Sequence, residues 1–319
     1  MRVGVTGGAG FIGSHVVDAL AGAGHEVIVL DQKAPHRLDV EHRGVDLMDR
    51  ERFAAATRGL DALFHLAAYA DVNDVVRDPV GAIDLNISGT LRALESARAN
   101  GIGRFVLASS VWVYSSHQPA TPDATVDEDA LISIDINRHV YTTTKLAAEM
   151  LCHDYWNAHG LPFTILRYGI PYGPRMRPSL VIPIFVRKAL NGEALTITGD
   201  GSQHRKFVYV EDLARGHVLA LSDAGKNETF NLDGAEKVTI LRIAETVMRL
   251  TGSKQPIEFL PARSGDYDGV NVSSEKAARL LGWRPRTTFD EGMRETVAWL
   301  AGRGMAATPA APQEAAARA

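Results

Sequence analysis

Cysteine, excess basic charge and long apolar runs are all scarce in this chain of 319 residues. The single cysteine, Cys152, excludes an internal disulfide and a zinc site made of cysteines. We therefore expect a buried thiol and no metal site. No apolar run approaches the ~20 residues of a membrane-spanning helix, and no signal peptide opens the chain, so we expect a cytoplasmic protein without a membrane partner. The formal net charge of -4 argues against nucleic acid as a partner.

Short apolar, β-branched runs alternate with helical patterns in the first half of the chain. The predicted strands are Arg2–Thr6, Glu26–Asp31, Gly44–Leu47, Ala62–Leu66, Arg104–Ser109 and Phe163–Tyr168. Helices are predicted between them, including Phe11–Gly22 and Ala82–Asn100. Apolar strands separated by helices indicate a parallel sheet covered on both faces. The sequence therefore predicts an α/β fold with a doubly wound parallel sheet of the Rossmann type.

The second half of the chain is less regular, and it begins with a loop, Gly169–Pro178, that contains three prolines. The sequence predicts a nucleotide-binding domain over residues 1–168 and a smaller α/β lobe that binds substrate over residues 169–302. Segments near 207–233 are expected to return to that first domain. The predicted elements of the second half are strands at Phe207–Val210 and Thr229–Leu232, and helices at Thr239–Thr251 and Ser274–Leu281. Residues 303–319, rich in alanine and proline, predict a disordered tail.

A glycine-rich segment follows the first predicted strand directly. It reads Gly7-Gly8-Ala9-Gly10-Phe11-Ile12-Gly13 and opens the first predicted helix. Glycines permit a tight turn and a close approach of the backbone to a pyrophosphate, while the helix N-terminus presents free N–H groups to that anion. Asp31 ends the second strand about twenty residues on, where a carboxylate binds the hydroxyls of the adenosine ribose. A carboxylate there repels a 2′-phosphate, so NAD is favoured over NADP, although Lys33 lies close by.

Two further strand ends fit the same cofactor. Asp46-Leu47 ends the third predicted strand, where the carboxylate can meet the adenine amino group. His65-Leu66-Ala67-Ala68 ends the fourth, where small residues let the backbone lie against the ligand. Open α/β sheets bind ligands at the carboxyl ends of their strands. We expect His65 itself to be a packed structural histidine.

Tyr141 and Lys145 are the candidate centre of the chemistry. They lie four residues apart at the start of a predicted helix that runs to about His159, so they share one face. An unperturbed tyrosine is a poor base at neutral pH, but a neighbouring ammonium and the positive nicotinamide of NAD favour its phenolate. Ser110 ends the fifth strand, where its hydroxyl can hold the substrate oxygen and relay the proton.

With these motifs, residues 1–300 resemble the extended short-chain dehydrogenase/reductases, specifically the NAD-dependent epimerase/dehydratase family that acts on nucleotide sugars. The anchors of the resemblance are the glycine motif, His65-Leu66-Ala67-Ala68, Asn86 with Gly89-Thr90, Ser109-Ser110 with Val113-Tyr114, Tyr141 with Lys145, Arg167-Tyr168, Tyr172-Gly173-Pro174-Arg175, Gly199-Asp200-Gly201-Ser202-Gln203 with Arg205 and Phe207, Arg263-Ser264-Gly265-Asp266 and Leu281-Gly282-Trp283.

The resemblance implies a role for each matching residue. Tyr141 takes a proton from a sugar hydroxyl as hydride passes to NAD, Lys145 holds the nicotinamide ribose, and Ser110 assists. Arg205 and Arg263 grip the nucleotide diphosphate, a task that suits guanidinium groups. The cofactor-binding set implied is Gly7, Gly10, Phe11, Ile12, Gly13, Asp31, Asp46, Leu47, Leu66, Ala67, Ala68, Asn86, Tyr141, Lys145 and Tyr168, and the substrate-binding set is Ser110, Val111, Tyr141, Arg205, Arg263 and Asp266.

The residues after Ser110 bear on the reaction. Sugar 4,6-dehydratases of the family carry Asp-Glu there, and glucuronate decarboxylases usually carry Glu at the second position; this chain has Val111-Trp112. Neither side chain is an acid or base, which favours a 4-epimerase that oxidises C4 of a nucleotide sugar, UDP-sugars being favoured, and returns the hydride to the other face. The alternatives are a 4-keto sugar reductase, an atypical dehydratase or decarboxylase, and a non-catalytic NAD-binding protein.

Two more expectations follow from the resemblance. Ile170 stands where relatives often carry an Asn that helps to hold the sugar nucleotide, so the sugar pocket departs from the usual pattern. Family members commonly pair through two helices per subunit, which correspond here to about Ala82–Asn100 and Tyr141–Ala158. The chain is therefore expected to form a homodimer.

Overall fold

The computed structural model describes residues 1–115, 124–133, 139–261 and 270–303. The chain divides into two compact units. Unit 1 comprises Met1–Pro171, Arg205–Lys237 and Asp268–Thr288, and unit 2 comprises Tyr172–His204, Val238–Tyr267 and Phe289–Ala319. Unit 1 thus includes not only residues 205–237 but also 268–288, a segment that was predicted to belong to the second lobe. In the described part of the chain, no helix is both long and apolar enough to cross a membrane.

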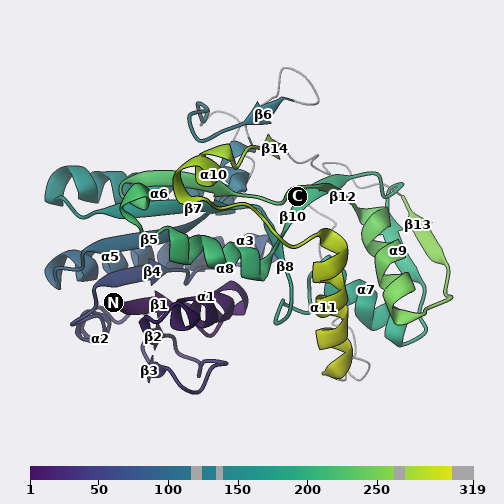
Figure 1. Cartoon of the computed structure of the whole chain (residues 1–319), viewed down its shortest axis with the longest axis horizontal. Helices are drawn as coiled ribbons and strands as arrows, with labels where there is room; N and C mark the ends of the chain where they lie inside the picture. Colours follow the sequence, from purple (N-terminus) through teal and green to yellow (C-terminus); the bar gives the residue numbers. More distant parts are fainter. Residues whose placement is uncertain (116–123, 134–138, 262–269, 304–319) are drawn as a thin grey trace. The chain divides into compact units, whose positions relative to one another are not determined.

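A seven-stranded sheet forms the centre of unit 1 (Figure 1), and its strand order is β11-β7-β5-β4-β1-β2-β3. Every neighbouring pair is parallel. The order reverses direction between β1 and β4, so the prediction of a doubly wound Rossmann sheet is confirmed. The strands are β1 (Arg2–Thr6), β2 (Glu26–Leu30), β3 (Glu41–Arg43), β4 (Ala62–His65), β5 (Arg104–Ser110), β7 (Phe163–Tyr168) and β11 (Glu228–Leu232).

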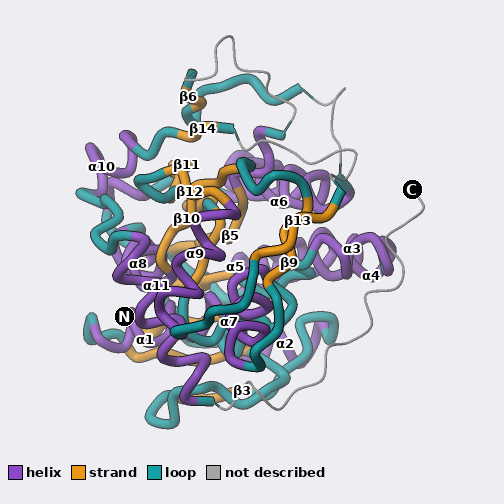
Figure 2. Tube along the Cα trace, turned by 90° about the vertical axis from the view of Figure 1, so that its right-hand side faces the viewer, coloured by secondary structure: helices purple, strands orange, loops and turns teal. Residues whose placement is uncertain are grey.

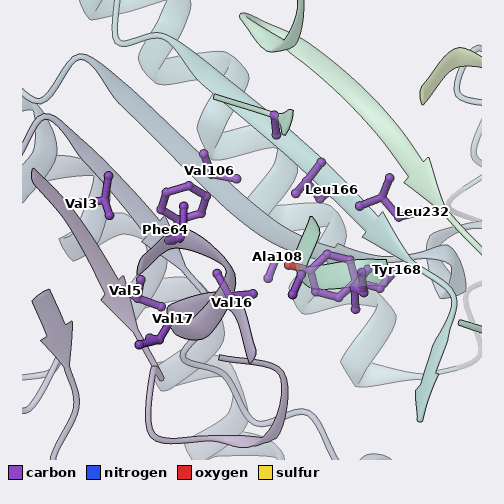
Figure 3. Packing of buried hydrophobic residues seen from close by; sticks show 14 of the residues in the cluster. Val3, Val5, Val16, Val17, Phe64, Val106, Ala108, Leu166, Tyr168 and Leu232 are labelled. Atoms are coloured by element: carbon purple, nitrogen blue, oxygen red, sulfur yellow. The ribbon is translucent and has the colours of Figure 1, made fainter. Parts of the chain in front are cut away.

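Helices cover both faces of this sheet, and alternate residues of each strand point to opposite faces. Valines of β1 and of the first helix, with Phe64, Val106 and Leu166, form one buried cluster (Figure 3). Residues one position along the same strands, such as Leu63, Phe105 and Ile165, join the other. The first cluster is covered by α1 (Phe11–Gly22), α8 (Val210–Leu219) and α10 (Glu275–Leu281), and the second by α2 (Arg50–Ala56), α5 (Gly89–Ala99) and α6 (Val140–His159).

Two predictions for unit 1 are wrong in their details. The third strand is Glu41–Arg43 rather than Gly44–Leu47, because the strand lies at the exposed edge and needs no apolar side chains. The helix predicted over Ala82–Asn100 begins three residues earlier and runs without interruption through α4 (Pro79–Ile83), a π-helical turn η1 (Asp84–Ser88) and α5. The remaining short elements of unit 1 are α3 (Val72–Arg77), η2 (Val111–Tyr114), β6 (Thr125–Val126), η3 (Asp223–Gly225) and β14 (Asn271–Val272).

Unit 2 is built around a parallel pair of strands, β9 and β13. Helices α7 and α9 pack against β9, and α11 packs against these two helices. Figure 2 shows the helices and the strand pair of this unit, and apolar residues of the helices, Phe185, Val247 and Met293 among them, are buried. The elements of unit 2 are α7 (Val181–Leu190), β9 (Leu195–Thr198), α9 (Ile240–Thr251), β13 (Ile257–Leu260) and α11 (Phe289–Gly302). Three of the boundaries between the units fall within β8 (Ile170–Tyr172), β10 (His204–Tyr209) and β12 (Lys237–Thr239), which form a three-stranded sheet.

Candidate active site

The glycine-rich loop joins β1 to α1 in a conformation that side chains would prevent. Gly7 has φ 68°, in the left-handed region, and its carbonyl accepts the N–H of Gly10 at 3.0 Å. A Cβ on Gly13 would lie 2.1 Å from the Gly7 carbonyl oxygen. Phe11 and Ile12 open α1, and no side chain caps its N-terminus. The loop therefore fits a pyrophosphate, which the open N–H groups of a helix N-terminus bind.

Asp31 follows β2, which ends one residue earlier than predicted. One carboxylate oxygen accepts the N–H of Ala9 at 3.1 Å and the other accepts the N–H of Lys33 at 2.9 Å. The carboxylate is thereby fixed beside the glycine-rich loop while it keeps lone pairs for further donors. That is the arrangement in which an acid accepts hydrogen bonds from a ribose diol.

Asp46 and Leu47 lie in a loop and not at the end of a strand. The Asp46 carboxylate accepts the N–H of Met48 at 2.8 Å and is exposed. The Leu47 side chain is buried in the cluster under α5, so packing in the core explains why this residue is apolar. Their contacts with adenine stay a prediction.

The segment after β4 lies directly against the glycine-rich loop. A Cβ on Gly7 would come within 2.8 Å of the Ala67 nitrogen. The Thr6 hydroxyl accepts the N–H groups of Leu66 and Ala67, each at 3.1 Å, which holds the backbone of this segment in place. Ala68 continues the same half-buried segment.

His65 is a buried neutral histidine whose tautomer follows from its neighbours. The Thr6 hydroxyl, already an acceptor for two N–H groups, donates to Nδ1 at 2.9 Å. Nε2–H donates to the Thr90 hydroxyl at 3.1 Å, since that hydroxyl donates its own proton to the Asn86 carbonyl. Burial, and then the charge of Lys145, lower the pKa of His65 to about 3. These contacts favour the predicted structural role.

Asn86 lies in the π-helical turn η1, and it ties two parts of the site together. Its side-chain oxygen accepts the N–H of Tyr69 at 2.7 Å, and its amide nitrogen donates to the Tyr69 carbonyl and to the Thr144 hydroxyl, each at 3.0 Å. Thr144 in turn donates to the Tyr141 carbonyl. Thr144 is not among the predicted site residues, although its place next to Lys145 in the Tyr141 motif offers a signal.

The structure brings Ser110, Tyr141 and Lys145 to the carboxyl end of β5, an inner strand of the sheet. Ser110 is the last residue of β5, and Lys145 Nζ donates to the carbonyl of Ala108 on the same strand at 2.9 Å. Tyr141 lies one turn earlier on α6, and its ring centroid is 5.8 Å from Lys145 Nζ. This ammonium is therefore close enough to favour a phenolate on Tyr141.

Lys145 is buried, and burial lowers its pKa to about 8 while Glu149 opposes the change. The Glu149 carboxylate also has other partners. It forms an ion pair of 2.6 Å with Arg167 and accepts a hydrogen bond from the Ser109 hydroxyl at 2.5 Å. Arg167 also donates to the Tyr114 hydroxyl at 2.6 Å. Arg167 and Tyr114 belong to the predicted family motifs, whereas the network that joins them to Glu149 was not predicted.

The other predicted residues take different positions. Tyr168 is buried beside Ser110 in the sheet, and its hydroxyl bonds to His217 at 2.5 Å, so its contact with a cofactor stays a prediction. Val111 is half-buried in the turn after Ser110, and Arg205 is half-buried on β10. Arg263 and Asp266 lie outside the described residues.

Comparisons with known proteins identify the family of this chain. The model of the NAD dependent epimerase/dehydratase family matches residues 3–233. A UDP-glucuronate 4-epimerase of Thermodesulfobacterium geofontis is 33% identical over 92% of this chain and 94% of its own length. UDP-glucuronic acid decarboxylase 1 of Danio rerio is also 33% identical, over 93% of this chain and 72% of its own length.

A solved structure supports the fold. The crystal structure of UDP-glucose 4-epimerase from Thermotoga maritima, with UDP-glucose, has a TM-score of 0.87 and 32% identity over 95% of this chain and 99% of that one. The predicted resemblance is confirmed, since a family model covers more than half of the chain and full-length relatives share a third of its residues. The chain belongs to the NAD-dependent epimerase/dehydratase family.

Proposed function

We propose that this protein is an NAD-dependent nucleotide-sugar 4-epimerase. The observation that carries the proposal is the group of Ser110, Tyr141 and Lys145 at the carboxyl end of β5. The turn that follows Ser110 begins with Val111 and Trp112. The group is suited to a reversible oxidation at C4. The turn offers no acid or base at the two positions that dehydratases use to eliminate water.

The chain's own residues would act on the C4 hydroxyl. The Ser110 hydroxyl holds the C4 oxygen, and the phenolate of Tyr141 takes the proton from it as the C4–H bond breaks. NAD bound beside these residues would supply a reversible hydride acceptor for C4. Lys145 remains mostly charged at neutral pH, since its pKa is about 8, and so stabilises the phenolate. Tyr141 then gives its proton back, and the net charge of the site is restored.

The cofactor and nucleotide contacts belong to the same proposal. Asp31 would accept the adenosine ribose hydroxyls and disfavour NADP, and Asp46 would meet adenine. Arg205, on β10 of unit 1, would bind the diphosphate of a UDP-sugar. UDP is favoured because the similar epimerase of Thermotoga maritima holds UDP-glucose.

A second candidate is a uronate decarboxylase, which the relative from Danio rerio supports at the same level of identity as the epimerase. Both reactions begin with oxidation at C4, and they differ in whether the 4-keto sugar then loses its carboxyl group. Trp112, where decarboxylases of the family usually carry Glu, favours the epimerase.

The test is to incubate the purified protein, without added cofactor, with UDP-glucose, UDP-glucuronate, UDP-N-acetylglucosamine and dTDP-glucose, and to identify products by NMR. A C4 epimer without net reduction of cofactor is expected. A pentose from UDP-glucuronate would instead establish the decarboxylase. Absence of any product from all four would refute both activities, and turnover of 4-keto sugars with added NADH would then establish a reductase.

We also propose that the protein is a cytoplasmic homodimer that pairs through α5 and α6. Both helices expose apolar side chains, including Leu91, 39% exposed, and Met150, 66% exposed. Size-exclusion chromatography with light scattering should give a dimer, and Met150→Glu should give a monomer. Leu38→Glu is the matched control, because Leu38 is exposed in a loop outside these helices. A wild-type monomer would refute the proposal.

A further inference from the structure

A chain of buried hydrogen bonds in unit 1 runs from the backbone after β4 to the start of α6. It passes through five side chains on five different elements, and each of these residues is at most 3% exposed: Thr6, His65, Asn86, Thr90 and Thr144. The proton donor of every bond in this chain can be assigned from the chemistry of its two partners, so the direction of the whole chain is known.

The first half of the chain starts beside the glycine-rich loop. Two backbone N–H groups of the Leu66–Tyr69 segment donate to the Thr6 hydroxyl, which donates to Nδ1 of His65. Nε2–H of His65 donates to the Thr90 hydroxyl, and this hydroxyl donates to the Asn86 carbonyl at 2.6 Å. The chain has thus reached the π-helical turn η1 with each hydroxyl accepting on one side and donating on the other.

The second half passes through the side chain of Asn86. Its amide nitrogen donates to the Tyr69 carbonyl and to the Thr144 hydroxyl, so the two N–H groups of this amide are both used. The amide nitrogen cannot accept, so Thr144 is the acceptor there and donates its only proton to the Tyr141 carbonyl at 2.8 Å. Bonds that all point in one direction polarise and strengthen one another.

Two adjacent residues therefore anchor the start of α6 to different parts of unit 1. Lys145 donates to a carbonyl of β5, the strand that ends with Ser110. Thr144 is joined through the chain to the Leu66–Tyr69 segment, which lies against the glycine-rich loop. One anchor sets Tyr141 relative to Ser110, and the other sets it relative to the loop that fits a pyrophosphate.

We propose that Thr144 is a positioning residue that holds Tyr141 against the bound cofactor, as the last link of this chain. The inference rests on the proposed function, because it takes Tyr141 as the base. A positive nicotinamide favours a phenolate only at short range, since the attraction between charges falls with their separation. Loss of the Thr144 hydroxyl should therefore weaken the effect of NAD on Tyr141 as well as slow the reaction.

Titration of Tyr141 with and without NAD tests the chain in the absence of any sugar nucleotide. Phenolate absorbance is followed as the pH rises, and the Tyr141→Phe variant supplies the background of the other tyrosines. In the wild type, NAD should move this titration to lower pH. Thr144→Val should lose most of that shift, whereas Thr144→Ser, which keeps the hydroxyl, should retain it.

Thr142→Val is the matched control for this titration. Thr142 is also buried on α6, and its hydroxyl has no hydrogen-bond partner among the described residues, so the same substitution there should leave the shift unchanged. Thr90→Val breaks the chain at an earlier link and should reduce the shift in the same direction as Thr144→Val. This second variant tests the chain even where Thr144→Val does not fold.

Steady-state kinetics separate positioning from substrate binding. With the sugar nucleotide that gives an epimer in the NMR test, Thr144→Val should lower kcat by about 10- to 100-fold, because a displaced base loses rate steeply. The KM should stay unchanged, since no substrate contact is removed. Thr144→Ser should restore kcat.

Three results would overturn the proposal: a full shift in both Thr144→Val and Thr90→Val, a loss in Thr142→Val as large as in Thr144→Val, or a wild type in which NAD does not move the titration of Tyr141. A shift that depends on Thr144, in a protein that forms no epimer, would instead support the positioning role and refute the epimerase. The two failures are therefore distinguishable.

Discussion

Replacing Lys145 with Met should change both the rate of reaction and the pH dependence of stability. The folded protein holds this amine buried, and its pKa falls from the ordinary 10.5 to about 8. In the unfolded chain the amine regains its ordinary pKa. Between about pH 8 and pH 10.5 the unfolded state therefore binds a proton that the folded state does not, and the stability of the wild type rises with pH in that window.

The size of the effect follows from the same two values. Each pKa unit corresponds to ~1.36 kcal/mol, so the difference between 10.5 and about 8 means that burying the ammonium costs about 3 kcal/mol at neutral pH. Most of that cost disappears by about pH 10. The stability of Lys145→Met relative to the wild type should therefore fall by about 2 kcal/mol between about pH 7 and pH 10. The variant also loses the hydrogen bond to the Ala108 carbonyl, which adds a cost that does not vary with pH.

Urea unfolding of both proteins over this pH range, in the same cofactor state, measures the difference. Lys226→Met is the matched control, because Lys226 is exposed and its variant should follow the wild type at every pH. The kcat of Lys145→Met should fall by about 10²- to 10⁴-fold. A stability difference that stays constant with pH would show that the Lys145 amine is not desolvated, and the argument for its pKa would fail.

Three further predictions follow from the site. Gly13→Ala should abolish NAD binding, measured by cofactor fluorescence, because its Cβ would lie 2.1 Å from the Gly7 carbonyl oxygen. The control variant Gly22→Ala, whose Cβ meets nothing within 4 Å, should bind NAD normally, and equal binding by both variants would contradict the argument. Glu149→Gln should lower the free energy of unfolding by about 3–5 kcal/mol, because it leaves Arg167 buried without its carboxylate, and Glu149→Leu with Arg167→Met should recover most of that loss in urea melts. The His65 imidazole should stay neutral to about pH 4 by NMR, since its pKa is about 3, so stability falls as the pH drops below about 6.5; titration near pH 6.5 would refute its burial as a neutral donor.

Apolar patterning predicted the buried strands but not the edge of the sheet. Central strands such as β7, at Phe163–Tyr168, are buried on both faces, so each of their residues carries the signal. The edge strand Glu41–Arg43 pairs on one side only and is polar, whereas Val45 and Leu47 pack into the core from a loop. In the middle of this sheet the buried residues are also the residues paired as strands. At the edge strand the paired residues are exposed and the buried residues lie in a loop, so apolar patterning predicted the wrong segment there.

Local spacing predicted the parts of the site that lie within one motif. Tyr141 and Lys145 share a helix face, and the glycines precede a helix, so their geometry follows from the period of the chain. The π-helical turn that carries Asn86 adds a residue to one turn of backbone, and nothing in the apolar pattern marks it. Thr6 and His65 meet only because β1 and β4 are neighbours, which requires the sheet order rather than the sequence.

The network behind Lys145 explains how the site keeps a buried ammonium charged. An isolated buried lysine would lose its proton at neutral pH, and a lysine paired with a free carboxylate would keep its ordinary pKa or a higher one. Glu149 opposes the effect of burial on Lys145, but its oxygens also hold Arg167 and Ser109. The remaining attraction is enough to hold the pKa of Lys145 at about 8. The Lys145 ammonium is therefore present at neutral pH to favour the Tyr141 phenolate. Because Glu149 is paired with Arg167, its carboxylate does not cancel the charge of Lys145 beside Tyr141. Glu149, held in place by its ion pair with Arg167, is thus the group that opposes the effect of burial on the charge of Lys145.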